Sequence, residues 1–219
     1  MRVLVLDAAL AFCAAAISID GRIAAEQRVV RAIGQSNLLP TMADAVLEAC
    51  GLSASELDFV AVTVGPGSFT GIRGALALAH GIRLAAGRPI VGVTVPEALE
   101  ADLPDVIGRD VWVAINSLRG HVFLARGGII SACALVRLPA PSAPVAIAGD
   151  AAIEVATRLA SAGANVMLTD ARAPSSGAIA AVGLRRHLGQ LPSLPAQPLY
   201  VDPPAVRAPS REARLPPGS

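Results

Sequence analysis

The stretch Gly65-Pro66-Gly67-Ser68-Phe69-Thr70-Gly71-Ile72-Arg73 joins an apolar segment to a helical one. The preceding residues, 59–64, predict a buried strand, and residues 70–86 predict a helix that ends at Gly87. Glycines at such a junction permit a tight turn and a close approach of the backbone. The segment therefore predicts a strand, a turn and a helix in direct succession, which is a unit of an α/β fold.

The same stretch raises the question of an anion site, because helix N-termini attract negative charge. Its glycine spacing, with a proline in the turn, differs from the dinucleotide-binding fingerprint, and no lysine follows as in a P-loop. Ser68 or Thr70 can instead cap the helix. From the geometry of the turn alone, a structural role is favoured over a phosphate site, and both remain open.

Outward from this turn, the hydrophobic pattern predicts the same order of elements twice. In the first half, Asp20-Gly21 is typical of a two-residue hairpin turn. The expected strands are 2–6, 11–19, 22–30, 59–64 and 89–93, with helices at 35–50 and 70–86. The second half repeats the pattern with strands at 111–115, 121–125, 129–135, 145–148 and 165–168, and helices at 151–162 and 175–188. We therefore expect a duplicated α/β fold with subdomains at 1–103 and 104–190, followed by a Pro-rich tail at 191–219.

The composition restricts the function. Charged residues make up 16% of the 219 residues, the formal net charge is +1, and the sequence contains no lysine. A Schiff base and a P-loop mechanism are thereby excluded, and no basic block indicates direct nucleic-acid binding. The three histidines, at 80, 121 and 187, lack the spacing of a metal site, so no metal is expected.

The location follows from two further features. The three cysteines, at 13, 50 and 133, suit neither a disulfide framework nor a zinc site, which favours reduced thiols. The apolar run at 3–19 contains Asp7 and is too short for a membrane span, which argues against both a secretory signal and an anchor. A cytoplasmic protein is expected.

Three strings carry a resemblance to a known family. GPGSFTGIR at 65–73, preceded by GQSNLLP at 34–40 and followed by PIVGVTVPEAL at 89–99, resembles the TsaB (YeaZ-like) family. The resemblance covers most of residues 1–100. It thins beyond residue 105 to Gly149-Asp150 and Pro198-Leu199-Tyr200. It implies the actin-like ATPase (ribonuclease H-like) fold in two subdomains, in a catalytically degenerate relative of the TsaD threonylcarbamoyltransferase.

In actin-like ATPases, an acidic residue and hydroxylated residues after the first strand contact nucleotide phosphate and magnesium. This chain has Asp7 there but continues with Ala8-Ala9, where members of the family often have Thr and Ser. The resemblance therefore implies no bound cofactor and no catalytic residue. It leaves a vestigial phosphate site as a candidate, made of Asp7, Gly65, Gly67, Ser68, Thr70 and Gly71.

The helices at 35–50 and 70–86 each have two apolar stripes, whereas a helix on a sheet needs only one. The second stripe predicts a further buried face, either in a larger core or against a partner. Agreement with the family favours the partner. The candidate residues are Leu38, Met42, Ala45, Ala49, Ile72, Ala75, Leu78 and Ile82.

The family resemblance favours a non-catalytic subunit that binds a TsaD-like transferase through residues 1–103 and supports threonylcarbamoyladenosine synthesis on tRNA. A TsaE-like ATPase is expected to join the assembly. The chain is expected to contact tRNA only through the complex, and to form a homodimer when alone. The alternative is an autonomous ATP-dependent transferase or kinase of the actin-like fold, with Asp7 at the phosphates. A protease is a third hypothesis, which no nucleophile–histidine pair supports.

Overall fold

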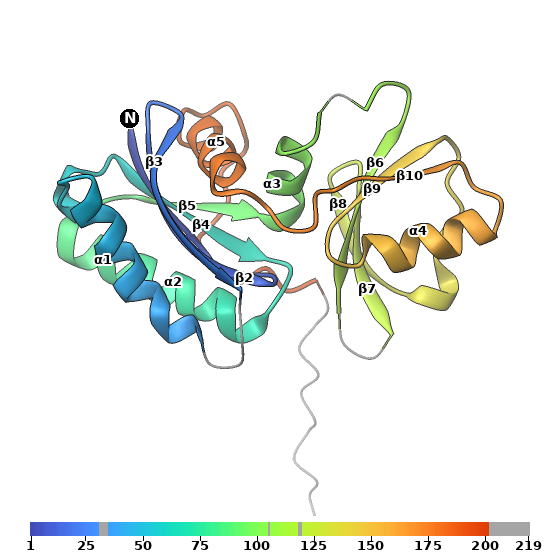
Figure 1. Ribbon diagram of the computed structural model, residues 1–219, viewed down its shortest axis with the longest axis horizontal. Coiled ribbons are helices and arrows are strands. Elements are labelled where there is room, and N and C mark those ends of the chain that lie inside the picture. The colour runs from blue at the N-terminus through green and yellow to red at the C-terminus, as the bar shows by residue number, and fades with distance from the viewer. Residues whose placement is uncertain (31–34, 105, 118–119, 202–219) are drawn as a thin grey trace, which may run out of the picture.

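The first half of the computed structural model is built on a five-stranded mixed sheet (Figure 1). The structure describes residues 1–30, 35–104, 106–117 and 120–201, so residues 202–219 of the predicted tail lie outside it. Strands β1 (Arg2–Asp7), β2 (Phe12–Ile19) and β3 (Arg22–Val30) form an antiparallel meander. Strands β4 (Phe59–Gly65) and β5 (Ile90–Thr94) continue the sheet in parallel with β1. The strand order is β3-β2-β1-β4-β5.

The second half repeats this topology. Its sheet contains the meander β6 (Asp110–Asn116), β7 (His121–Arg126) and β8 (Ile129–Ala134), followed by β9 (Val145–Ala148) and β10 (Val166–Leu168). The order β8-β7-β6-β9-β10 matches that of the first sheet position by position. The duplicated α/β fold predicted from the sequence is therefore confirmed.

Helices cover both faces of the first sheet (Figure 1). Helices α1 (Leu39–Ala49) and α2 (Phe69–Ala86) lie side by side on one face, and α5 (Ser176–His187) lies on the other. Helix α4 (Ala152–Ser161) packs on the second sheet. Three short 3₁₀ segments complete the described elements, at Gln35–Leu38, Ala54–Glu56 and Leu135–Arg137.

The local signals explain where several elements begin and end. Asp20 and Gly21 both have positive φ, as the predicted hairpin turn requires. Helix α2 is capped by the Ser68 side chain and ends at Gly87, which has a left-handed conformation. Helix α3 (Val95–Ala101) was not predicted from the sequence, although the Thr94 and Glu97 side chains form a capping box at its start.

Helix α5 departs from the simple duplication. The sequence pattern places it in the second repeat, but it packs against β1, β4 and β5 of the first sheet. Its buried Ile179 and Val182 belong to one cluster with Val5 and Phe59. The chain therefore returns to the first sheet after β10. The subdomain limits of 1–103 and 104–190 stay a prediction, and α5 by its packing belongs with the first sheet.

The two halves share one continuous core. The main cluster of buried side chains contains Leu4, Leu6 and Val62 of the first sheet together with Val113 and Ile115 of β6. Helix α3 contacts β4, β5 and β6, and so bridges the two sheets. None of the helices within the described residues is long and apolar enough to cross a bilayer.

Candidate functional site

The turn after β4 lies against the turn after β1. A Cβ atom on Gly67 would stand 2.3 Å from the carbonyl oxygen of Ala9, so only glycine fits at this position. The backbone N–H of Ser68 donates to the same oxygen at 2.7 Å. The Ser68 hydroxyl in turn accepts from the N–H of Gly71 at 3.3 Å. The chain itself thus occupies two of the amide groups that a phosphate would need.

Asp7 forms hydrogen bonds within the fold. Its carboxylate is 1% exposed and accepts hydrogen bonds from the Thr63 hydroxyl at 2.6 Å and from the N–H of Ala9 at 3.0 Å. Both donors come from the first sheet and its turn. A buried carboxylate with these partners holds the ends of β1 and β4 together. The structure thus brings Asp7 and the 65–71 turn close together and provides a structural account of both.

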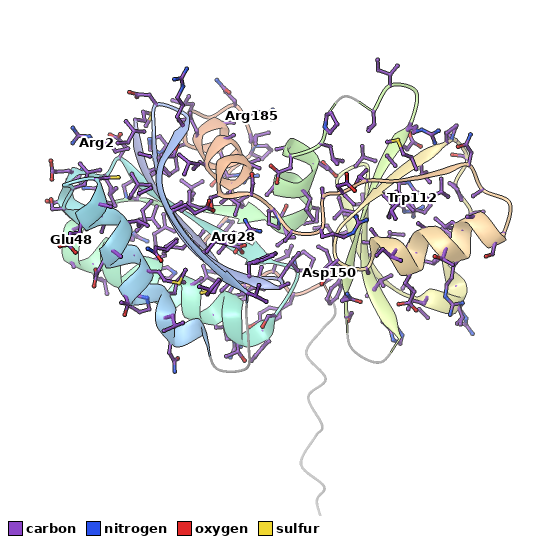
Figure 2. The ribbon with its side chains drawn as sticks, viewed as in Figure 1. Arg2, Arg28, Glu48, Trp112, Asp150 and Arg185 are labelled. Carbon is purple, nitrogen blue, oxygen red and sulfur yellow. The ribbon has the colours of Figure 1, made fainter. Side chains whose placement is uncertain are left out.

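The second half has an equivalent junction. A Cβ atom on Gly149, after β9, would stand 2.1 Å from the carbonyl oxygen of Ala114 in β6. The adjacent Asp150 accepts a hydrogen bond from the N–H of Asn116 at 2.8 Å. Figure 2 places Asp150 where the two halves face each other. In both halves, therefore, a glycine lies directly against a backbone carbonyl oxygen, that of Ala9 for Gly67 and that of Ala114 for Gly149.

A cleft of about 670 Å³ opens between these two junctions. It is lined from the first half by the turns after β1 and β4, from the second half by β6, β7 and Asp150, and from the C-terminal segment by residues 198–201. Its aromatic lining residues are Phe69, Phe123 and Tyr200. Of the residues predicted for a vestigial phosphate site, Gly67, Ser68 and Thr70 line this cleft, whereas Asp7, Gly65 and Gly71 are not among its lining residues.

No metal centre is evident in the described part of the chain: no group of three His, Cys, Asp or Glu side chains lies close enough to hold an ion. The residues that line the cleft carry hydroxyl groups, amide groups and one carboxylate, that of Asp150. These groups can accept and donate hydrogen bonds. They form no assembled nucleophile and base.

The predicted partner residues divide into two sets. Met42, Ile72 and Ala75 are buried in the main core of this chain, so they are not available to a partner. The reason is that α1 and α2 pack both on the sheet and on each other, and these contacts bury part of the second stripe. The remaining candidates, which are exposed or partly buried, are Leu38, Ala45, Ala49, Leu78 and Ile82.

The outward face of α2 was missed from the sequence. Gly74, Ala77, Gly81 and Leu84 follow one another at spacings of three and four residues and are exposed or half-exposed. Leu84 is 88% exposed, and a Cβ atom on Gly81 would meet no atom within 4 Å. A face of glycine and alanine has little hydropathy contrast, which is why the pattern did not reveal it. Small residues allow the close approach of another helix.

Comparisons with known proteins find similar proteins for part of the chain. The family model of TsaD, tRNA N6-adenosine threonylcarbamoyltransferase, matches residues 32–127. The tRNA threonylcarbamoyladenosine biosynthesis protein TsaB of Escherichia coli K12 is 34% identical over 126 residues, which cover 57% of this chain and 54% of TsaB. A TsaB of Buchnera aphidicola is 29% identical over 110 residues, 50% of this chain and 46% of the relative.

Part of the chain is therefore similar to proteins named TsaB and to the TsaD family.

Two solved structures have the same fold as this chain. YeaZ from Pseudomonas aeruginosa superposes with a TM-score of 0.69 at 22% identity, covering 91% of this chain and 99% of YeaZ. A P. aeruginosa protein described as similar to the peptidase YEAZ gives a TM-score of 0.74 at 22% identity, covering 92% and 99%. The chain therefore shares the fold of YeaZ. The chain spans about half the length of the curated TsaB relatives it matches.

Proposed function

We propose that this chain is a non-catalytic subunit that binds a TsaD-type transferase and supports the synthesis of threonylcarbamoyladenosine on tRNA. Its relatives named TsaB carry this biosynthesis in their names. The observation that carries the proposal is the position of Asp7. Asp7, the acidic residue expected at a nucleotide phosphate, is buried and bonded to Thr63 and Ala9. Both hydrogen bonds hold this carboxylate at the ends of β1 and β4, which supports a structural role for Asp7.

The surface for the partner is the outer side of α1 and α2. This surface consists of the exposed or partly buried residues that remain from the sequence prediction, together with the outward face of α2. An apolar face of this kind is costly in water, so in the absence of TsaD it pairs with a second copy of the chain as a homodimer. A TsaE-like ATPase joins the assembly, which acts in the cytoplasm and contacts tRNA chiefly through TsaD.

The binding test uses the purified full chain and the TsaD of the same organism in titration calorimetry. We expect a stoichiometric complex. Gly81→Arg places a long cationic side chain on the outer face of α2, where nothing in the monomer opposes it. This variant should keep the thermal stability of the parent and bind TsaD at least about tenfold more weakly. Ala181→Arg is the matched control, because Ala181 is exposed on α5 at the opposite face of the sheet.

The catalytic alternative is tested in parallel. ATP turnover is measured on the chain alone and on Asp7→Asn. Turnover by the parent that is lost in Asp7→Asn, with folding intact, would favour an autonomous ATP-dependent transferase or kinase. Absence of any complex with TsaD would contradict the partner role.

A further inference from the structure

The C-terminal segment wraps around the edge of the first sheet. We call residues 191–201 the strap. Arg186 of α5 donates to the carbonyl oxygens of Pro192 and Gly92, at 2.8 and 2.7 Å, and so directs the strap past β5, the edge strand. The strap then lies over Gly92, where a Cβ atom would stand 3.0 Å from the carbonyl oxygen of Pro195. The missing side chain at Gly92 leaves the room that the strap fills.

The strap then continues along α2, on the face of the first sheet that α1 and α2 cover. Its apolar residues Leu194, Ala196 and Leu199 pack against the main core. The N–H of Leu199 donates to the carbonyl oxygen of Val64 at 2.9 Å, and His80 of α2 contacts the carbonyl oxygen of Ala196 at 3.1 Å. The layer on this face is therefore α1, α2 and the strap. The strap delivers Tyr200 to the first turns of α2.

At that point an arginine contacts the ring of one aromatic residue and the hydroxyl of another. The Arg73 guanidinium carbon lies 3.8 Å from the centre of the Phe69 ring, and the same guanidinium donates to the Tyr200 hydroxyl at 2.7 Å. Phe69 is 59% exposed and Tyr200 is 49% exposed. We call Phe69, Arg73 and Tyr200 the aromatic–arginine cluster.

The cluster is unusual for this composition. The whole chain has six aromatic residues, namely four Phe, one Tyr and one Trp, and two of them are half-exposed in the cluster. Phe123, a third, lines the same cleft. Aromatic side chains and arginine are the residues that most often dominate the binding free energy of protein interfaces. Side chains that already contact each other, as Arg73 contacts Phe69 and Tyr200, also lose little conformational freedom on binding.

The charge of Arg73 gives the chemistry of the partner. Among the described residues, no carboxylate lies within 4 Å of its guanidinium. Helix α2 contains Arg73, His80 and Arg83 and no acidic residue. A planar guanidinium fixed by a ring and a phenol is positioned to form a bidentate pair with a carboxylate.

We propose that the aromatic–arginine cluster is the centre of a docking surface continuous with the outward face of α2, and that the protein partner presents a carboxylate to Arg73 from within an apolar surface. The proposal rests on the proposed function, because it specifies how the TsaD-type partner is bound. The strap is then part of the interface, since it positions Tyr200.

The test measures the Kd of the full chain for TsaD at low and high salt, with variants of the cluster. Arg73→Met should weaken binding about tenfold or more, and Arg73→Lys should recover only part of the loss because it keeps the charge without the planar fork. Arg73→Met removes the charge and should reduce the salt dependence of the Kd relative to the parent, whereas Arg73→Lys keeps the charge and should keep most of that dependence. Arg83→Met, an exposed arginine on the same helix, is the matched control and should change the Kd by less than about threefold.

Two further variants distinguish an effect on TsaD binding from an effect on folding. Tyr200→Phe removes the hydroxyl and keeps the ring, so it should weaken binding at unchanged thermal stability. Gly92→Val adds a side chain beneath the strap. This variant should raise the hydrogen-exchange rate of the Leu199 amide and weaken TsaD binding together.

The outcomes distinguish this inference from the function on which it rests. A parent chain that binds TsaD, with Arg73→Met equal to Arg83→Met, would overturn the cluster and leave the partner role standing. A parent that binds no TsaD would overturn both. A third arm adds inorganic phosphate to the chain alone. If phosphate raises the melting temperature in an Arg73-dependent way and TsaD binding is insensitive to Arg73, the cluster is a small-anion site and the docking inference is wrong.

Discussion

Arg186 of α5 and Glu97 of α3 form an ion pair that joins the last helix of the chain to the helix between the two sheets. Arg186 is 9% exposed and also donates to the carbonyl oxygens of Gly92 and Pro192. Its guanidinium therefore connects α5, β5, α3 and the start of the strap. This side chain, together with the buried Ile179 and Val182, joins α5 to the first sheet.

Replacement of Arg186 by methionine should destabilise the protein strongly. The variant keeps much of the apolar stem but leaves two carbonyl oxygens and a half-buried carboxylate without their donor. We expect the free energy of unfolding to fall by about 2–4 kcal/mol in denaturant titrations. Arg185→Met is the matched control, since Arg185 is adjacent but exposed (Figure 2), and should change stability by less than about 0.5 kcal/mol. Equal effects of the two variants would show that the Arg186 network contributes nothing to stability.

The same network predicts a dependence on pH. Burial opposes the ionisation of Glu97, but hydrogen bonds from Thr94 and Arg186 outweigh it and hold the pKa of the Glu97 carboxyl below its usual value of 4.5. A lowered pKa in the folded state stabilises the fold above the unfolded pKa, and this contribution is lost as the pH falls through the folded pKa. The stability difference between the parent and Glu97→Gln should therefore be constant near neutral pH and shrink below about pH 4.5. Urea titrations of both proteins between pH 3 and 7 measure it, and a difference that grows on acidification would refute the assignment.

The close approaches at Gly149 and Gly67 predict unequal costs for glycine substitutions. Gly149 and Gly163 both have positive φ, but only at Gly149 would a Cβ atom meet a backbone carbonyl, at 2.1 Å. Gly163→Ala should cost about 1 kcal/mol from backbone strain alone. Gly149→Ala adds a steric conflict and should cost about 2–4 kcal/mol in total. Gly67→Ala should likewise be strongly destabilising because of Ala9. Similar melting temperatures for Gly149→Ala and Gly163→Ala would contradict the conflict.

Local signals in the sequence predicted most elements correctly. The Asp20-Gly21 turn and the Gly87 helix end are decided by backbone conformations that few residues adopt, so their positions can be read directly. Helix α3 was missed because its seven residues are too few to show a helical period. Its signal was the spacing of Thr94 and Glu97 with Pro96 between them, which is a capping box with a proline in the first turn.

Contacts between distant segments had no such signal. Tyr200 and Arg73 are 127 residues apart, and neither has a neighbour in the sequence that indicates the other. The return of α5 to the first sheet is equally invisible in the pattern of helix and strand. The stripe on α1 and α2 was assigned to a partner because the sequence shows how many apolar faces a helix has, and not which neighbour covers each face.

Arginine substitutions at Met42 and at Ala77 test which side chains of α1 and α2 face a partner. Met42 is 6% exposed and lies in the main core, whereas Ala77 is exposed on the outward face of α2. Met42→Arg places an unpaired guanidinium in that core and should lower the free energy of unfolding by several kcal/mol, about 3 or more. Ala77→Arg adds the same side chain where water reaches it, and arginine is nearly as good a helix former as alanine, so stability should change by less than about 0.5 kcal/mol.

The two variants should behave in opposite ways when TsaD binding and thermal unfolding are measured together. Met42→Arg should unfold at a much lower temperature, and any loss of binding should follow its loss of folded protein. Ala77→Arg should melt like the parent and still bind TsaD at least about tenfold more weakly, because the arginine blocks close approach to Gly74 and Gly81. A stable Met42→Arg that fails to bind would return Met42 to the interface. An Ala77→Arg that binds like the parent would remove the outward face of α2 from the docking surface.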